Sequence, residues 1–158
     1  MPDSPIRKAC AGDLDAVGRM LRQVLKLHHD GRPDLFPPTG KKYTDAELCA
    51  IFENPDTPVF VYELDGQVVG YVFCELQVPR SHNLNPIKTL YIDDLCVDEC
   101  ERKSGVGKRL FERVKAYAKE NGFDWITLNV WNDNVNALAF YRKMGLTERK
   151  TILEYRVD

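Results

Sequence analysis

The sequence lacks the features of a membrane protein, a secreted protein or a nucleic-acid-binding domain. No apolar run approaches the roughly 20 residues of a membrane-spanning helix, and the first residues show no secretory signal pattern. The 22 basic residues are balanced by 24 acidic ones, which leaves a net charge of −2, whereas nucleic-acid-binding domains are usually clearly basic. We therefore expect a cytoplasmic protein that binds neither membranes nor nucleic acid.

Cysteine is sparse and shows no pairing pattern. The five cysteines are scattered along the chain, and three of them lie inside apolar segments, which indicates buried, reduced thiols rather than disulfides. Cys96 and Cys100 miss a CxxC spacing by one position, and no second pair or histidine cluster accompanies them. We expect no metal site.

The length of 158 residues fits one domain, spanning residues 1–158. Apolar spacing of 3.6 residues and capping signals predict helices, and apolar runs or alternation between turn signals predict strands. The Asp65-Gly66 pair is typical of a type I′ turn in a hairpin. Strands are expected at 5–9, 59–64, 67–76, 89–97, 125–130 and 146–157, and helices at 12–28, 44–54, 106–121 and 134–144. This order predicts an α/β domain with a mixed sheet.

The segment Arg102-Lys103-Ser104-Gly105-Val106-Gly107 is the most informative stretch. It joins the strand at 89–97 to the helix that begins near Val106. The first amides of a helix have no intrahelical partner and carry partial positive charge, and glycines let a phosphate approach the backbone. Lys103, Lys108 and Arg109 add cationic side chains. The turn therefore predicts a phosphate site, with a plain glycine turn among solvated lysines as the alternative.

The sequence lacks residues that two common phosphate-binding motifs require. A nucleotide P-loop needs a glycine where Arg102 stands and a hydroxyl residue where Arg109 stands. A dinucleotide fingerprint needs a third glycine where Leu110 stands. The phosphate must belong to another class of ligand.

The chain resembles the GNAT superfamily of acyl-CoA-dependent N-acetyltransferases. The signature of that superfamily, Arg/Gln-x-x-Gly-x-Gly/Ala, is matched by Arg102, Gly105 and Gly107. A second signature is matched at its spacings by Asn134, Ala137, Tyr141 and Gly145, although Leu146 replaces the usual phenylalanine. The resemblance implies a single-domain GNAT-like fold, with a mixed, mostly antiparallel sheet flanked by helices and with splayed fourth and fifth strands.

The resemblance also implies how acetyl-CoA, the expected co-substrate, is held. The backbone amides of the signature turn would bind the pyrophosphate, and the preceding strand would hydrogen-bond the pantetheine arm. Asn134 and Asn136 would help to position it. The residues carried over to this role are Leu95, Cys96, Val97, Arg102, Lys103, Ser104, Gly105, Val106, Gly107, Lys108, Asn134 and Asn136. No metal is required.

Acetyl transfer to an amine needs a base, because a free alkylamine is mostly protonated at neutral pH. Family members often carry an acidic residue on the fourth strand, so Asp93 is the first candidate base, directly or through water, and Asp94 the second. Alternation along a strand would send the two carboxylates to opposite faces. Pairing of Asp93 with Arg80 or Lys88 is the structural alternative. Tyr141 matches the family's general acid; its apolar helix face is also typical of a core residue.

The acceptor is less clearly specified. Acidic residues near the expected cleft favour a cationic amine, and they are Asp93, Asp94, Asp98, Glu99 and Glu101. The first hypothesis is a small-molecule N-acetyltransferase that acts on a polyamine, an aminoglycoside or a similar amine. Acetylation of a protein N-terminus or lysine is the second, and a non-catalytic acyl-CoA sensor belongs to another class. Dimers are frequent in the family, so a homodimer is among the expected states.

Overall fold

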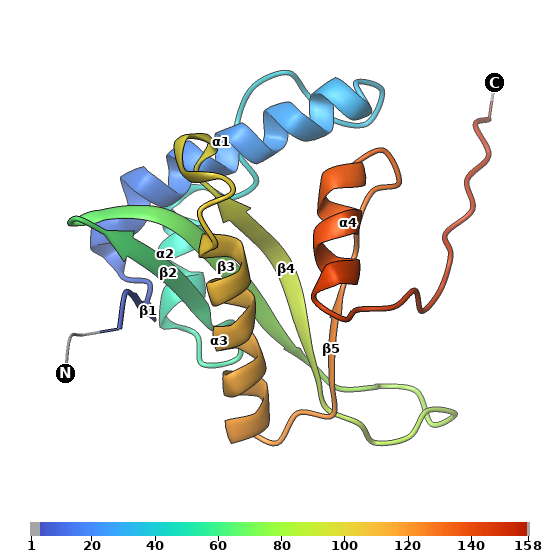
Figure 1. Cartoon of the computed structure of the whole chain (residues 1–158). Coiled ribbons are helices and arrows are strands. Elements are labelled where there is room, and N and C mark those ends of the chain that lie inside the picture. The colour runs from blue at the N-terminus through green and yellow to red at the C-terminus, as the bar shows by residue number, and fades with distance from the viewer. Residues whose placement is uncertain (1–3, 158) are drawn as a thin grey trace.

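A central sheet with strand order β1-β2-β3-β4-β5 forms the middle of the computed structural model, which describes residues 4–157 (Figure 1). Its strands are β1 (Ile6–Lys8), β2 (Val59–Leu64), β3 (Gln67–Gln77), β4 (Thr89–Val97) and β5 (Trp125–Leu128). The helices are α1 (Leu14–Gly31), α2 (Asp45–Glu53), α3 (Val106–Glu120) and α4 (Val135–Lys143), with short 3-10 turns η1 (Ala11–Asp13) and η2 (Glu99–Glu101). This confirms the α/β GNAT-like fold.

The fourth and fifth strands splay apart, as the family resemblance implies. β1 to β4 pair antiparallel, whereas β4 and β5 pair parallel over only four residues, from Thr89 with Trp125 to Ile92 with Leu128. β5 then ends, while β4 continues to Val97 with β3 on one side only. Within the described residues, the second half of β4 therefore has an edge with no neighbouring strand.

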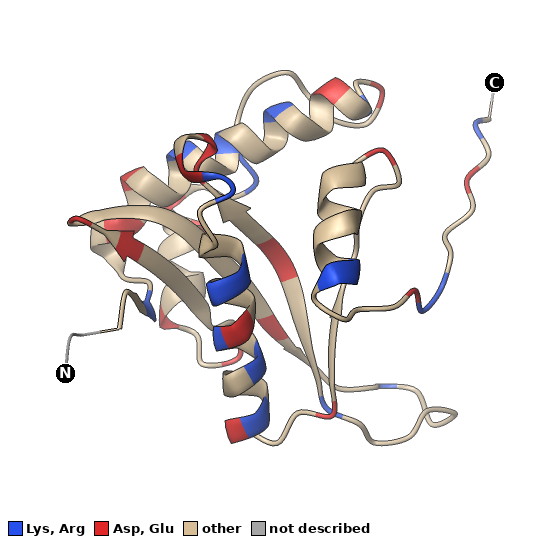
Figure 2. Ribbon diagram, in the orientation of Figure 1, with Lys and Arg blue, Asp and Glu red and all other residues tan. Residues whose placement is uncertain are grey.

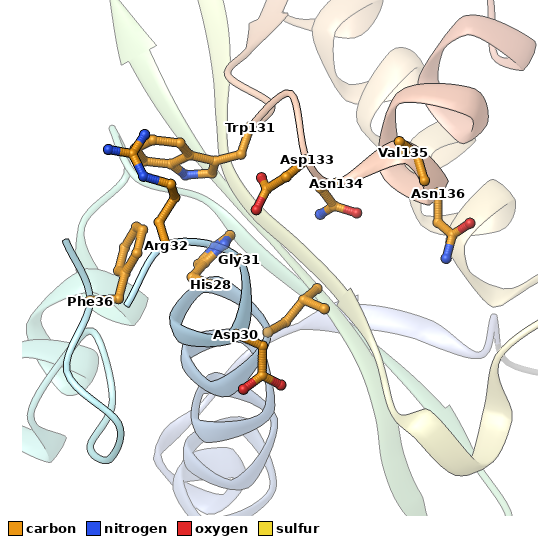
Figure 3. A pocket seen from close by; sticks show the side chains of 11 residues that line it. His28, Asp30, Gly31, Arg32, Phe36, Trp131, Asp133, Asn134, Val135 and Asn136 are labelled. Carbon is orange, nitrogen blue, oxygen red and sulfur yellow. The ribbon is translucent and has the colours of Figure 1, made fainter. Parts of the chain in front are cut away.

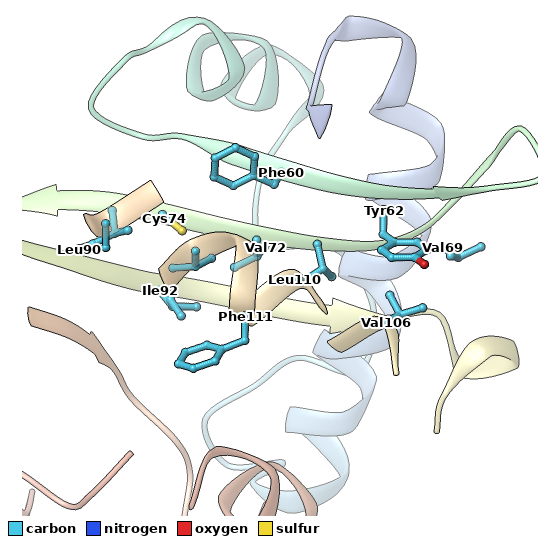
Figure 4. Close-up of a cluster of buried hydrophobic side chains, with 12 residues drawn as sticks. Phe60, Tyr62, Val69, Val72, Cys74, Leu90, Ile92, Val106, Leu110 and Phe111 are labelled. Carbon is cyan, nitrogen blue, oxygen red and sulfur yellow. The ribbon is translucent and has the colours of Figure 1, made fainter. Parts of the chain in front are cut away.

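Helices cover both faces of the sheet because its strands alternate. On β2, Val59 and Val61 face the layer of α1 and α2, while Phe60 and Tyr62 face α3. Figure 4 shows the α3 side, where the helix residues Leu110 and Phe111 belong to one buried cluster with residues of β2, β3 and β4. The helix and sheet apolar stripes are thus buried against one another.

Most expected local signals are confirmed. Asp65 and Gly66 both have positive φ, as a type I′ hairpin turn requires. Thr44 accepts the amide of Glu47, and the Glu47 carboxylate accepts the amide of Thr44, which completes the capping box of α2. Of the five cysteines, which are all free, Cys74 and Cys96 are buried, whereas Cys10 and Cys100 are exposed.

The strand expected at 146–157 is wrong. In the described residues this segment is extended but belongs to no sheet, and β5 pairs only with β4. The reason is physical: a strand needs an edge to pair with, and this segment follows α4 away from the sheet (Figure 1). β5 and β1 are also shorter than expected. None of the helices within 4–157 has the length and apolar character that crossing a membrane demands.

Candidate active site

The N-terminus of α3 has the features of an anion-binding site. Gly105 precedes the helix with φ of +86°, and Lys103 also has positive φ. Among residues 4–157, no side chain caps the helix, and its first turn holds no acidic residue, so its first amides are left without a partner there. Figure 2 shows basic residues before and after this turn. The helix dipole and these cations favour a negatively charged group.

Two side chains near the turn are engaged in other contacts. Arg109 donates a 2.6 Å hydrogen bond to the Tyr62 hydroxyl, which directs its guanidinium to the β2 side. The Ser104 hydroxyl donates to the carbonyl of Glu101. The backbone of the turn is therefore a better anion ligand than either of these side chains.

The open edge of β4 continues toward this turn. The amide of Asp98 donates to the carbonyl of Val69 on β3, at 2.8 Å. Backbone direction alternates along a strand, so the amides and carbonyls of Leu95 and Val97 point away from β3, and those of Cys96 point toward it. An extended, peptide-like ligand could pair with Leu95 and Val97 there.

A β-bulge in β4 places Asp93 and Asp94 on one face of the sheet. Phe73 pairs with Asp94 and Cys74 pairs with Ile92, so Asp93 is the extra residue of the bulge. Both carboxylates then accept hydrogen bonds from tyrosines of the α1/α2 side, Asp93 from Tyr43 and Asp94 from Tyr71. The expectation that the two side chains point to opposite faces is wrong, because the bulge interrupts the alternation.

Asp94 lies in an environment that suits proton transfer. Burial raises its pKa to about 6, although a 2.6 Å hydrogen bond from the Tyr71 hydroxyl opposes that rise. Burial, and then the charge of Asp94, raises the pKa of Tyr141 well above its usual value. Tyr141 therefore stays a neutral phenol, and the pKa of the Asp94 carboxylate lies nearer to neutral pH than that of an ordinary aspartate.

Asp93 is tied to its surroundings by different partners from those expected. Its carboxylate pairs with Lys42 at 2.8 Å and accepts the Tyr43 hydroxyl at 2.6 Å, and neither Arg80 nor Lys88 reaches it. Both partners come from the segment between α1 and α2. Asp93 thereby connects that segment to the bulge.

A cavity of about 200 Å³ lies between the end of α1 and the start of α4. In Figure 3, the aromatic side chains of Phe36 and Trp131 and the His28 ring lie on one side, and Asp133 and Asn134 lie on another. Gly31 makes this approach possible, because a Cβ there would lie 1.7 Å from the Asp133 carboxylate. Burial lowers the pKa of His28, which favours its neutral form.

Asn134 and Asn136 line this cavity. The side chain of Asn134 also caps α4, since its oxygen accepts the amide of Ala137 at 3.2 Å. The sequence did not identify Tyr71, Tyr43 and Lys42 as site residues. No local pattern predicts that a side chain will contact a residue on the neighbouring strand or reach the site from a loop.

Comparisons with known proteins agree with this geometry. A protein-family model described as the acetyltransferase (GNAT) family matches residues 21–146. An N-alpha-acetyltransferase of Sulfurisphaera tokodaii is 28% identical over 158 residues, which cover 97% of this chain and 86% of that protein. Curated relatives differ in length, and the chain spans 94% of one and 61% of another.

Solved structures share the fold. A mutant of the BH1408 protein from Bacillus halodurans is 30% identical, with a TM-score of 0.92 and coverage of 96% of this chain and 98% of that one. An aminoglycoside N-acetyltransferase solved in complex with CoA has a TM-score of 0.71 over 97% of this chain and 98% of that one, and its 17% identity shows likeness of fold alone. Together, the splayed β4 and β5, the uncapped α3 turn and the family match show that this chain belongs to the GNAT family of acetyltransferases.

Proposed function

We propose that this protein transfers the acetyl group of acetyl-CoA directly to a primary amine of a small cationic molecule, with both substrates bound together. The observation that carries the proposal is the presence of three features that acetyl transfer from acetyl-CoA requires. These are the uncapped turn at Gly105, the open edge of β4, and Tyr141, whose pKa is raised by burial and by the charge of Asp94.

The site for acetyl-CoA would extend from the turn before α3 along the open edge of β4. The pyrophosphate of acetyl-CoA would lie on the turn of residues 102–108, where the amides are free and Gly105 leaves open space. Its pantetheine arm, which has two amide groups, would pair with the backbone of Leu95 and Val97. Asn136, and the part of Asn134 not used in capping, would contribute from the start of α4, where both side chains line the cavity.

Asp94 is the base that the electrostatics favour over Asp93. A base needs a pKa near the working pH so that it is ionised and still able to hold a proton. Asp94 meets this condition with a pKa of about 6. Asp93 is held instead by Lys42 and Tyr43 and is better placed to orient the acceptor-side segment.

The reaction then balances as follows. The amine nitrogen forms a bond to the thioester carbonyl carbon while its proton passes to Asp94, directly or through water. A backbone amide of the open β4 edge that the pantetheine arm leaves unpaired donates to the carbonyl oxygen as that oxygen becomes negative. The carbon–sulfur bond breaks, and the Tyr141 hydroxyl protonates the departing thiolate. Tyr141 is suited to this because it stays protonated.

The cavity supports a cationic acceptor. Arg32 pairs with Asp34 and Glu154, and Asp30 pairs with Lys26, so these charges are already compensated. Among the described residues that line the cavity, the Asp133 carboxylate forms no ion pair, and it lies with Trp131 and Phe36. An aromatic wall with one carboxylate that forms no ion pair favours an ammonium group.

The test is thiol release from acetyl-CoA in the presence of a panel of amines, with product masses to confirm acetylation. The panel contains polyamines, aminoglycosides, monoamines and peptides with free N-termini. We expect release only when an amine is added, fastest with a small polycation. Acetyl-CoA binding without release across the whole panel would contradict catalysis and favour a sensor.

Acetylation of a protein N-terminus is the second candidate, and the relative named N-alpha-acetyltransferase favours it. The two candidates differ in the acceptor and share the chemistry. Faster thiol release with peptides than with polycations would select the second one.

A further inference from the structure

Asp98 is the first residue after β4 and begins the loop that leads to the turn of residues 102–108. Its side chain is only 9% exposed, although it carries a carboxylate. One carboxylate oxygen accepts a hydrogen bond from the Arg19 guanidinium of α1, and the other accepts the amide of Cys100 at 3.2 Å. The hydrogen bond from Arg19 keeps the pKa of Asp98 below its usual value. Asp98 is therefore a buried anion whose countercharge comes from a helix 79 residues earlier in the chain.

A second side chain of α1 contacts the next residue of the loop. The side-chain oxygen of Gln23 accepts the amide of Glu99 at 3.3 Å. Gln23 lies four residues after Arg19, so both side chains project from one face of the helix. In Figure 1 the loop that follows β4 lies against α1. The helix therefore holds this loop at two successive residues.

Hydrogen bonds connect Asp98 to the turn itself. The amide of Glu101 donates to the carbonyl of Asp98 at 2.8 Å, and the Ser104 hydroxyl donates to the carbonyl of Glu101. On either side of Ser104 the backbone has positive φ, +67° at Lys103 and +86° at Gly105. A lysine in the left-handed region is strained, because its Cβ crowds the backbone there. Contacts from elsewhere in the fold must therefore hold the turn in this shape.

We propose that Arg19 and Gln23 are positioning residues for acetyl-CoA, which hold the turn of residues 102–108 in the shape that binds the pyrophosphate. Both act through the loop after β4 rather than by contact with the ligand. The inference rests on the proposed place of the pyrophosphate and is independent of the acetyl acceptor and of the catalytic roles. Loss of either side chain should weaken binding of the pyrophosphate end of the ligand and spare the pantetheine arm, which would lie on the edge of β4.

The test compares the binding of CoA with that of pantetheine, which contains the same arm but lacks the pyrophosphate and the nucleotide. Calorimetric titration of the full chain gives a Kd for each ligand. Arg19→Met should raise the Kd for CoA about tenfold or more, as for loss of a charge-assisted hydrogen bond, and leave the Kd for pantetheine unchanged. Arg19→Lys should restore most of the CoA binding. Gln23→Met, which leaves no buried charge unpaired, should weaken CoA binding with the same selectivity but to a smaller extent.

Arg22→Met is the matched control, because Arg22 is an exposed arginine of α1 that forms no ion pair among residues 4–157. It should leave both Kd values unchanged. Equal weakening of CoA and pantetheine binding by Arg19→Met would show a general structural role and overturn the proposal, as would unchanged CoA binding in both Arg19→Met and Gln23→Met. A wild-type protein that binds CoA no more tightly than pantetheine would refute the pyrophosphate site itself, and the positioning role with it.

Discussion

The Tyr71 hydroxyl donates a 2.6 Å hydrogen bond to the Asp94 carboxylate across the β3–β4 pair, on the face covered by α1 and α2. Burial disfavours the charged form of Asp94, and this hydrogen bond favours it. The resulting pKa of about 6 is therefore set by two opposed effects, and one of them can be removed by mutation.

Tyr71→Phe should move the acidic limb of the pH–rate profile. With Asp94 as the base, kcat/KM rises with pH through about 6. Loss of the hydrogen bond removes a stabilisation of the carboxylate, so the pKa rises and the limb shifts upward by about 1–2 pH units. The rate should fall near pH 7 and recover at higher pH. Tyr43→Phe, which removes the corresponding bond to Asp93, is the matched control and should leave the limb in place.

Asp94→Asn should lose activity without losing stability. We expect kcat to fall about 10²–10⁴-fold, as for loss of a general base. The raised pKa means that the folded protein loses stability as pH rises through the range from the unfolded value of about 4 to about 6, and asparagine removes this loss. Thermal unfolding at pH 7.5 should show an equal or higher Tm. A kcat loss at least as large in Asp93→Asn would instead assign the base to Asp93.

Tyr141→Phe should bind acetyl-CoA normally and turn over slowly. The phenol stays protonated because its pKa is raised, so Tyr141→Phe removes a proton donor and little packing volume. Calorimetric titration should give an unchanged Kd for acetyl-CoA, while the rate of thiol release falls at least about tenfold. Undiminished turnover would remove the acid role from Tyr141.

Gly105→Ala and Gly107→Ala form a matched pair at the phosphate turn. Gly105 has a φ of +86°, so alanine there is strained by about 1–2 kcal/mol and should raise the KM for acetyl-CoA. A Cβ at Gly107 would lie 3.5 Å from Phe140, which is ordinary van der Waals contact. Chemical denaturation and steady-state kinetics should both show a defect in the first variant and little change in the second.

Asp133→Asn should weaken binding of the acceptor amine and leave binding of acetyl-CoA unchanged. If the Asp133 carboxylate holds an ammonium group, its loss raises the KM for the preferred polyamine about tenfold or more and leaves the KM for acetyl-CoA unchanged. Asp30→Asn is the control, because that carboxylate also lines the cavity but already pairs with Lys26. Equal effects of the two variants on the amine KM would argue against a specific role for Asp133.

The sequence by itself determined the local features of this protein. Glycine spacing predicted the turn at Gly105, a capping box predicted the start of α2, and Asp65-Gly66 predicted the hairpin, because each depends on a few neighbouring residues. Two spaced motifs were enough to predict the family, and with it the splay of β4 and β5.

Only the tertiary structure decided how distant segments meet. The bulge that turns Asp93 and Asp94 to one face is a property of two paired strands, and no local pattern in β4 contains it. The hydrogen bond from Tyr71 that tunes Asp94 likewise spans 23 residues of sequence. The C-terminal segment has a strand's composition, but a strand exists only where an edge receives its hydrogen bonds, and within residues 4–157 no edge pairs with this segment.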